Sequence, residues 1–166
     1  REKFGLGSGP IVSYLGRVSP RKGVEHLVAA FADDAMAPAQ LVVAGNDMGA
    51  LATARSSADE RVLFTGLLEG SERLSLLVDS DVLVYPSSDE IFGLVPFEGL
   101  MCGAPVVVGG DCGCGQLIRE AGAGLLVNHA DVSALQERIR LLLSDREAAS
   151  AMVERGRDYV ANELSF

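Results

Sequence analysis

The chain has 166 residues, 48% of them apolar, and a formal net charge of −9. This length suits one domain built around a single core. The negative charge disfavours general binding to nucleic acid or to an anionic membrane, because both attract cationic surfaces. No apolar run is long enough to span a bilayer and no secretory leader is apparent, so we predict a cytoplasmic protein without a transmembrane segment.

Short runs of β-branched residues alternate with segments of helical periodicity along the chain. Six runs are predicted to be strands: Ile11–Leu15, Leu41–Ala44, Val62–Phe64, Val82–Tyr85, Val106–Val108 and Leu125–Val127. This alternation predicts a doubly wound α/β domain with a parallel sheet of about six strands, occupying residues 1–166. Two helices in succession, Val132–Leu143 and Glu147–Asn162, are predicted after the last strand and are expected to form a closing cap.

The loop after the first strand carries Arg17 and Lys22 near the start of the next helix. Free backbone N–H groups and the helix dipole favour an anion at such a position. Arg offers a planar fork for phosphate oxygens and Lys a mobile charge, so the pair suits a diphosphate without a metal ion. The alternative is an ordinary solvated basic loop.

The loop after the fourth strand contains Glu90 and Glu98, which bracket the start of a predicted helix. Between them, Gly93 allows a ligand to approach the backbone and leaves the N–H groups of Leu94 and Val95 available to phosphate. A carboxylate can accept two hydrogen bonds from a vicinal diol of a sugar. The alternative is a helix with acidic residues placed at its positive end for stability.

The loop after the fifth strand, Gly109–Gln116, precedes a predicted helix at Leu117–Ala121. Its glycines allow close approach of the backbone to a ligand, but their spacing is not that of a dinucleotide-binding fingerprint, so nicotinamide binding is disfavoured.

The cysteines are odd in number and lack a secretory context, so disulfide bonds are not expected. Cys112 and Cys114, even with His129, lack the ligand spacing of a zinc site, and we predict two loop thiols and no metal. His26 lies beside apolar neighbours and receives no functional role.

Together these segments resemble the C-terminal, donor-binding domain of the retaining group 1 glycosyltransferases of GT-B fold, a family-4-like group. The similarity covers nearly the whole chain. It is carried by Gly16-Arg17, Lys22-Gly23, Gly45, Val62-x-Phe64-x-Gly66, Pro86-Ser87, the E-x7-E pair, Phe92-Gly93-Leu94, Cys102-Gly103-Ala104-Pro105-Val106-Val107 and Gly122-x-Gly124-Leu125-Leu126-Val127.

The resemblance implies catalytic roles for three side chains. Arg17 and Lys22 would bind the donor diphosphate, and Glu90 would contact the transferred sugar. Glu98 would bind the ribose hydroxyls of the nucleotide.

The remaining contacts implied by the resemblance come from the backbone. Gly93, Leu94 and Val95 would bind the phosphates, the segment from Leu63 to Gly66 would lie against the base, and the loop from Gly110 to Gly113 would meet the sugar hydroxyls.

One departure from the family pattern concerns Gln116, where relatives often have glutamate, and the Cys112-Gly113-Cys114-Gly115 segment before it. This departure leaves the preferred sugar undefined.

By the same resemblance, the donor is a nucleoside diphosphate sugar (UDP-, GDP- or ADP-linked), bound without a metal or other cofactor. A hexosyl group would pass with retention to a hydroxyl acceptor, which is a glycan, a lipid-linked molecule or a small molecule. The acceptor, and any contact with a membrane, would be reached through an N-terminal Rossmann-like domain that this sequence lacks, so the chain alone is expected to bind rather than catalyse.

Several alternatives remain at this stage. Another GT-B enzyme, such as a sugar-nucleotide epimerase or a sucrose- or trehalose-forming synthase, would share the nucleotide site. A non-catalytic nucleotide-sugar-binding module would also share it. A glycoside hydrolase would use two carboxylates but would not need Arg17 and Lys22, and a ligand-free α/β scaffold would need neither.

Overall fold

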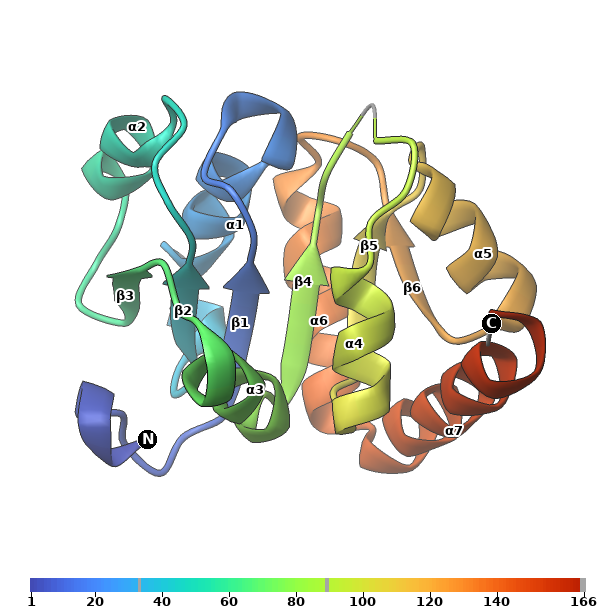
Figure 1. The fold of residues 1–166 in the computed structure, drawn as a ribbon. Helices are drawn as coiled ribbons and strands as arrows, with labels where there is room; N and C mark the ends of the chain where they lie inside the picture. Colours follow the sequence, from blue (N-terminus) through green and yellow to red (C-terminus); the bar gives the residue numbers. More distant parts are fainter. Residues whose placement is uncertain (33, 89, 165–166) are drawn as a thin grey trace.

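The computed structural model describes residues 1–32, 34–88 and 90–164. These residues form a six-stranded, all-parallel sheet with the order β3-β2-β1-β4-β5-β6 (Figure 1). The strands are β1 Ile11–Leu15, β2 Gln40–Ala44, β3 Val62–Gly66, β4 Val82–Tyr85, β5 Val106–Gly109 and β6 Gly124–Val127. The predicted α/β class and all six predicted strands are therefore confirmed, with small differences at the strand ends.

The central strands are apolar on both faces because helices cover both sides of the sheet. Every residue of β1, β4 and β5 is buried. The polar exception in β1 is Ser13, whose hydroxyl lies 2.6 Å from that of the equally buried Ser80. This pairing satisfies both hydroxyls where water cannot reach them.

The helices divide between the two faces of the sheet (Figure 1). One face is covered mainly by α1 and α6, and the other by α3, α4, α5 and α7. The helices are α1 Val24–Phe31, α2 Leu51–Ser56, α3 Gly70–Asp79, α4 Val95–Cys102, α5 Gly113–Ala121, α6 Val132–Ser144 and α7 Arg146–Glu163. Short 3-10 turns occur at Glu2–Phe4, Pro20–Lys22 and Asp34–Met36.

The two C-terminal helices form as predicted, but they do not make a common cap. Helix α6 packs against α1, whereas α7 packs against α4 and α5 on the other side of the sheet. Asp145 marks the change of direction, and its carboxylate caps α7 by accepting a hydrogen bond from Ala148 N at 2.9 Å. The pair therefore closes both faces of the sheet rather than one end of it.

The strand order reverses between β1 and β4. The chain moves outward from β1 to β2 and β3, then returns to the other side of β1 with β4. In doubly wound sheets, the crevice beyond the carboxyl ends of the strands at such a reversal is where ligands bind. The loops that follow β1 and β4 meet there, along the upper edge in Figure 1.

Within the described parts of the chain, no helix has the length and apolar character needed to cross a bilayer.

Candidate functional site

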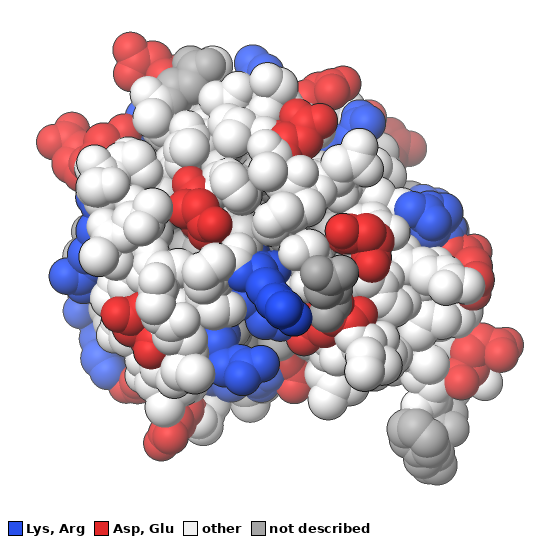
Figure 2. Space-filling model, turned by 90° about the horizontal axis from the view of Figure 1, so that it is seen from above, with Lys and Arg blue, Asp and Glu red and all other residues white. Residues whose placement is uncertain are grey.

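The loops after β1 and β4 are joined at the carboxyl edge of the sheet. Ser88 N donates to the carbonyl oxygen of Arg21 at 2.9 Å. Gly23 has a φ of 67°, and a Cβ there would lie only 2.8 Å from the carbonyl oxygen of Pro86. A larger residue would therefore separate the two loops. Seen from above this edge, basic side chains lie near the middle of the face with acidic ones around them (Figure 2).

Lys22, Tyr85 and Glu90 form a compact polar cluster where these loops meet. Lys22 Nζ lies 2.7 Å from Glu90 Oε2 and donates to the Tyr85 hydroxyl at 3.2 Å. The Tyr85 hydroxyl in turn donates to Glu90 Oε2 at 2.6 Å. Lys22 is only 8% exposed, so its charge is held in a fixed position. An ammonium group has three N–H donors, and this cluster uses two of them.

The cluster keeps Glu90 ionised. Partial burial acts to raise the pKa of Glu90, but hydrogen bonds from Lys22 and Tyr85 outweigh it, and the net effect lowers the pKa. Burial and the neighbouring Glu90 raise the pKa of Tyr85, which stays a protonated donor. The site therefore contains a fixed cation and a fixed anion joined by a neutral hydroxyl.

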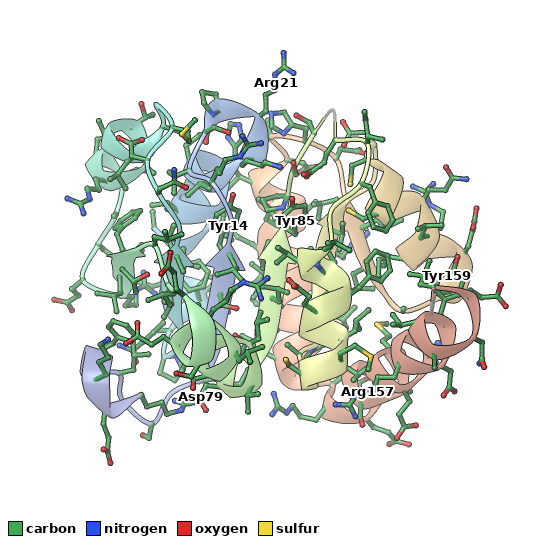
Figure 3. All side chains as sticks on the ribbon, viewed as in Figure 1. Tyr14, Arg21, Asp79, Tyr85, Arg157 and Tyr159 are labelled. Atoms are coloured by element: carbon green, nitrogen blue, oxygen red, sulfur yellow. The ribbon has the colours of Figure 1, made fainter. Side chains whose placement is uncertain are left out.

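Arg17 lies in the same loop but outside this cluster. Its side chain is exposed, and no ion pair or side-chain hydrogen bond links its guanidinium to any of the described residues. Its carbonyl oxygen accepts a hydrogen bond from the Tyr14 hydroxyl at 2.6 Å, which fixes the loop from below. Figure 3 shows Tyr14 and Tyr85 close together beneath the loops, whereas Arg21 points away from the molecule.

Glu98 occupies a different environment from Glu90. It lies in the first turns of α4, as predicted, and forms an ion pair with Arg73 of α3. The two side chains are 36% and 30% exposed. The E-x7-E spacing therefore places one carboxylate in the polar cluster and the other in a more accessible groove between helices.

The turn from Gly93 to Val95 leads into α4 beside Tyr85. A Cβ on Gly93 would lie 2.9 Å from Tyr85 Cε1, so this backbone packs directly on the tyrosine ring. Leu94 precedes the helix and provides no side-chain cap. The first turn of α4 has no side-chain cap, which is compatible with an anion at its amides, and the predicted phosphate contacts of Gly93, Leu94 and Val95 stay a prediction.

Leu63 and Gly66 belong to β3 rather than to a loop. This strand forms one edge of the sheet and is separated from β1 by β2. Gly66 ends the strand, and its carbonyl oxygen accepts a hydrogen bond from Gly45 N at 2.8 Å. Only Gly66 thus reaches the carboxyl edge, while Leu63 lies three residues farther down the strand. The predicted contact with a base stays a prediction.

The segment after β5 differs from the expected loop. Helix α5 begins at Gly113, not at Leu117, so Gln116 lies within its first turn. Gly110 N donates to Val127 O at 2.9 Å and Gly113 N donates to the carbonyl oxygen of Glu90 at 3.0 Å. These amides are already used inside the protein, which leaves those of Asp111 and Cys112 as the better candidates for contacts with a sugar.

Gln116 and Arg119 line a shallow groove beside this segment. The Gln116 amide donates to Glu120 Oε1 at 2.9 Å. In the portions of the chain that the structure describes, no three His, Cys, Asp or Glu side chains come together as a set of metal ligands.

Three residues of the site were not predicted from the sequence: Tyr14, Tyr85 and Arg73. The two tyrosines end or nearly end buried strands, where a hydroxyl among apolar residues indicates a polar partner nearby. That pattern could have drawn attention to them. Arg73 gives no comparable signal, because one arginine on an exposed helix face is common.

The polar site lies where the loops after β1 and β4 meet. Comparison with known proteins shows the family to which the chain belongs. A family model described as "Glycosyl transferases group 1" matches residues 1–159. The chain belongs to this family. The predicted similarity to the C-terminal half of this family is thereby confirmed.

Two curated relatives illustrate the match. The 2-deoxystreptamine glucosyltransferase of Streptomyces kanamyceticus is 30% identical over 99% of this chain and 44% of its own length. The GDP-mannose-dependent monoacylated alpha-(1-6)-phosphatidylinositol monomannoside mannosyltransferase of Corynebacterium glutamicum is 30% identical over 100% of this chain and 46% of its own length. The chain thus spans less than half of these relatives.

Among solved structures, the sucrose-phosphate synthase of Thermosynechococcus elongatus superposes with a TM-score of 0.80 at 34% identity. The superposition covers 97% of this chain and 43% of that one. The doubly wound domain described above is therefore one half of a GT-B fold.

Proposed function

We propose that this chain binds the donor, a nucleoside diphosphate sugar, of a glycosyltransferase that transfers a hexosyl group with retention to a hydroxyl acceptor. The observation that carries the proposal is the Lys22–Tyr85–Glu90 cluster at the strand reversal between β1 and β4. The cluster fixes a lysine that uses two of its three N–H donors within the cluster, at the place where doubly wound sheets bind phosphates.

The donor diphosphate would lie between Lys22, Arg17 and the start of α4. Lys22 supplies a charge already fixed in place, and the exposed Arg17 guanidinium is available to close over the phosphates. The uncapped amides near Leu94 add the positive end of a helix. These groups would stabilise the negative charge that develops on the leaving diphosphate without a metal ion.

The two glutamates would bind the two ends of the donor. Glu98, about a third exposed, can exchange its contact with Arg73 for the ribose hydroxyls. Glu90, ionised and held from one side by Lys22, has its other oxygen for a hydroxyl of the sugar. A carboxylate paired in this way is a poor nucleophile, so we propose that Glu90 positions the sugar and does not form a covalent intermediate.

The acceptor and the complete catalytic centre would come from the half of the parent protein that this chain does not include. The two curated relatives carry different sugars in their names, glucose and mannose, so the sugar and the base of the donor are left to measurement.

The test is calorimetric titration of the chain with UDP, GDP and ADP, each with magnesium and with EDTA. We expect one diphosphate to bind with equal affinity in both conditions. Arg17→Ala should weaken that binding about ten-fold, the effect of losing one charged hydrogen-bonding group. Arg21→Ala is the matched control, since Arg21 lies in the same loop but points into solvent.

Two outcomes would count against the proposal. Equal losses in Arg17→Ala and Arg21→Ala would indicate nonspecific attraction of an anion to a basic loop. Binding that requires magnesium would overturn the metal-independent mechanism.

A further inference from the structure

Two thiols lie against each other at the start of α5. Cys112 Sγ and Cys114 Sγ are 3.2 Å apart, and both side chains are buried, with 4% and 0% exposure. The Cys112 thiol also lies 3.0 Å from the carbonyl oxygen of Gly109. The bond in a disulfide is about 2.05 Å long, so only a small movement separates this pair from a covalent link.

Cys112 has the properties of a reactive thiol. The hydrogen bond from Cys114 lowers the pKa of Cys112 to about 7, against the opposing effect of burial. Near neutral pH, Cys112 is therefore divided between the thiol, which donates to the Gly109 carbonyl oxygen, and the thiolate, which is the form that attacks oxidants. Cys112 also lines a groove of about 430 Å³ that is open to solvent, and a molecule as small as a peroxide fits such a groove.

Cys114 is suited to complete a disulfide. Its hydrogen bond to Cys112 and its burial raise the pKa of Cys114, so it stays protonated while Cys112 is a thiolate. Oxidation of Cys112 to a neutral sulfenic acid removes its negative charge, which is one of the causes that raise the pKa of Cys114. A buried thiol next to an oxidised sulfur is the arrangement that resolves a sulfenic acid into a disulfide.

The segment between the thiols is attached to the loop that carries Glu90. Gly113 N donates to the carbonyl oxygen of Glu90 at 3.0 Å. A Cβ on Gly113 would lie 1.9 Å from the carbonyl oxygen of Ile91, so the two backbones are in direct contact. The backbone of Gly93 also faces Cys114 and acts to lower the pKa of that thiol. Movement of either sulfur is therefore transmitted to the turn between Glu90 and α4.

We propose that the Cys112-Gly113-Cys114 segment is a site of reversible oxidation, at which a hydroperoxide converts the two thiols into a disulfide and thereby weakens binding of the nucleotide sugar. The second half of this statement rests on the proposed function, whereas the first does not.

The reaction proceeds in two balanced steps. The Cys112 thiolate attacks one oxygen of hydrogen peroxide, the O–O bond breaks, and the departing hydroxide takes a proton to become water. The resulting sulfenic acid is attacked by Cys114 sulfur, its S–O bond breaks, and a second water leaves with the Cys114 proton. The two thiols are oxidised by two electrons, and the peroxide is reduced by the same two.

Closure of the disulfide would change the donor site through the backbone. Drawing the sulfurs together would shift Cys114 relative to the backbone of Gly93, and Gly113 relative to the Glu90 carbonyl oxygen to which it donates. Both contacts position segments assigned above to the sugar and the phosphates. Reduction by a dithiol would restore the original contacts.

The test uses the 166-residue chain carrying Cys102→Ser, which removes the third thiol, situated on α4. The protein is treated with hydrogen peroxide, free thiols are counted with a chromogenic reagent, and the Cys112–Cys114 peptide is examined by mass spectrometry. We expect both thiols to be lost, the peptide to lose two hydrogen atoms, and dithiothreitol to reverse both changes. Calorimetry with the preferred nucleoside diphosphate sugar should show binding about ten-fold weaker in the oxidised state.

Cys114→Ser is the matched variant, and there the reaction should stop at the sulfenic acid of Cys112, detectable with a dimedone probe. Persistence of both thiols under peroxide in the Cys102→Ser protein would overturn the oxidation site, and this readout does not depend on folding of the second variant. Formation of the disulfide with unchanged affinity would overturn its effect on the donor. Failure of the reduced protein to bind any nucleotide would instead count against the proposed function and leave the thiol result intact.

Discussion

Glu90 and Glu98 belong to one sequence motif, but their surroundings differ. The Glu90 side chain is 20% exposed and is paired with the Lys22 side chain, which is itself 10% exposed, and the Tyr85 hydroxyl donates to the same oxygen. Glu98 is 36% exposed and meets a single arginine on a neighbouring helix. The first carboxylate is part of the folded framework, whereas the second is accessible to a ligand.

This difference separates two kinds of contribution to a binding site. Breaking a partly buried ion pair leaves a charge without a partner, so it costs stability as well as binding. Exposed pairs contribute little to stability, so changes at Glu98 should affect the ligand alone. The following variants test that separation.

The largest effect is expected for Lys22→Met, which keeps the apolar stem and removes the charge. Glu90 then loses the ammonium group with which it forms an ion pair, and the donor diphosphate loses a positive charge that is held in a fixed position. Nucleoside diphosphate affinity should fall by about 100-fold, and the free energy of unfolding by about 1–3 kcal/mol. Calorimetry and urea unfolding measure the two quantities. Arg21→Met, in the same loop, should change neither, and undiminished binding by Lys22→Met would contradict the assignment.

Glu98→Ala should weaken nucleoside diphosphate binding about ten-fold while changing stability by less than about 1 kcal/mol. Inorganic pyrophosphate has no ribose, so its affinity should be unaffected in the same titration. Arg73→Ala breaks the same ion pair but keeps the carboxylate, and it should preserve nucleotide binding. Equal losses for the nucleotide and for pyrophosphate would show that Glu98 does not bind ribose.

Tyr85→Phe removes the hydroxyl that joins Lys22 to Glu90. We expect a loss of about 1–2 kcal/mol of stability and pyrophosphate affinity about three-fold to ten-fold weaker, because Lys22 becomes less fixed. Tyr14→Phe is the comparison, since among the described residues the Tyr14 hydroxyl bonds only to the carbonyl oxygen of Arg17. Tyr14→Phe should weaken the binding of pyrophosphate less than Tyr85→Phe does. A larger loss in Tyr14→Phe would refute a positioning role for Tyr85.

The smallest effect concerns acid stability. The folded protein lowers the pKa of Glu90 below its ordinary value of 4.5, so this carboxylate stabilises the fold above that pH and the contribution is lost as the pH falls through the lowered value. Glu90→Gln should therefore flatten the decline of unfolding free energy below pH 4.5, measured by urea titration. An unchanged slope would mean that Glu90 does not favour ionisation in the folded state.

The sequence was sufficient to predict the strands because each is a short apolar run between glycines and polar turns. It also placed Glu98 correctly in the first turns of a helix. The partners of the two glutamates could not be predicted from the sequence, because Tyr85 and Lys22 are 63 residues apart and Arg73 and Glu98 are 25 residues apart. Such contacts depend on strand order and helix packing, not on spacing along the chain.

The start of α5 was misplaced for a related reason. Glycine and cysteine are poor helix formers, so Gly113 to Gly115 looked like a loop. Tertiary contacts override that preference, because a Cβ on Gly115 would lie 2.1 Å from the carbonyl oxygen of Gly109 and only glycine permits this packing. Local propensity therefore failed where the backbone of α5 approaches β5 most closely.

The position of β1 between β2 and β4 also bears on synthesis of the protein. As the chain leaves the ribosome, β2 can pair with one side of β1, and β3 with β2, as soon as they emerge. The other side of β1 stays open until β4 arrives about 70 residues later. Every side chain of β1 is apolar except Ser13 and the hydroxyl of Tyr14, so during this interval the nascent chain exposes an apolar strand with one unpaired, aggregation-prone edge. The central strand that supports the lysine loop is thus also a strand that lacks one of its two partners until the second half of the sheet is made.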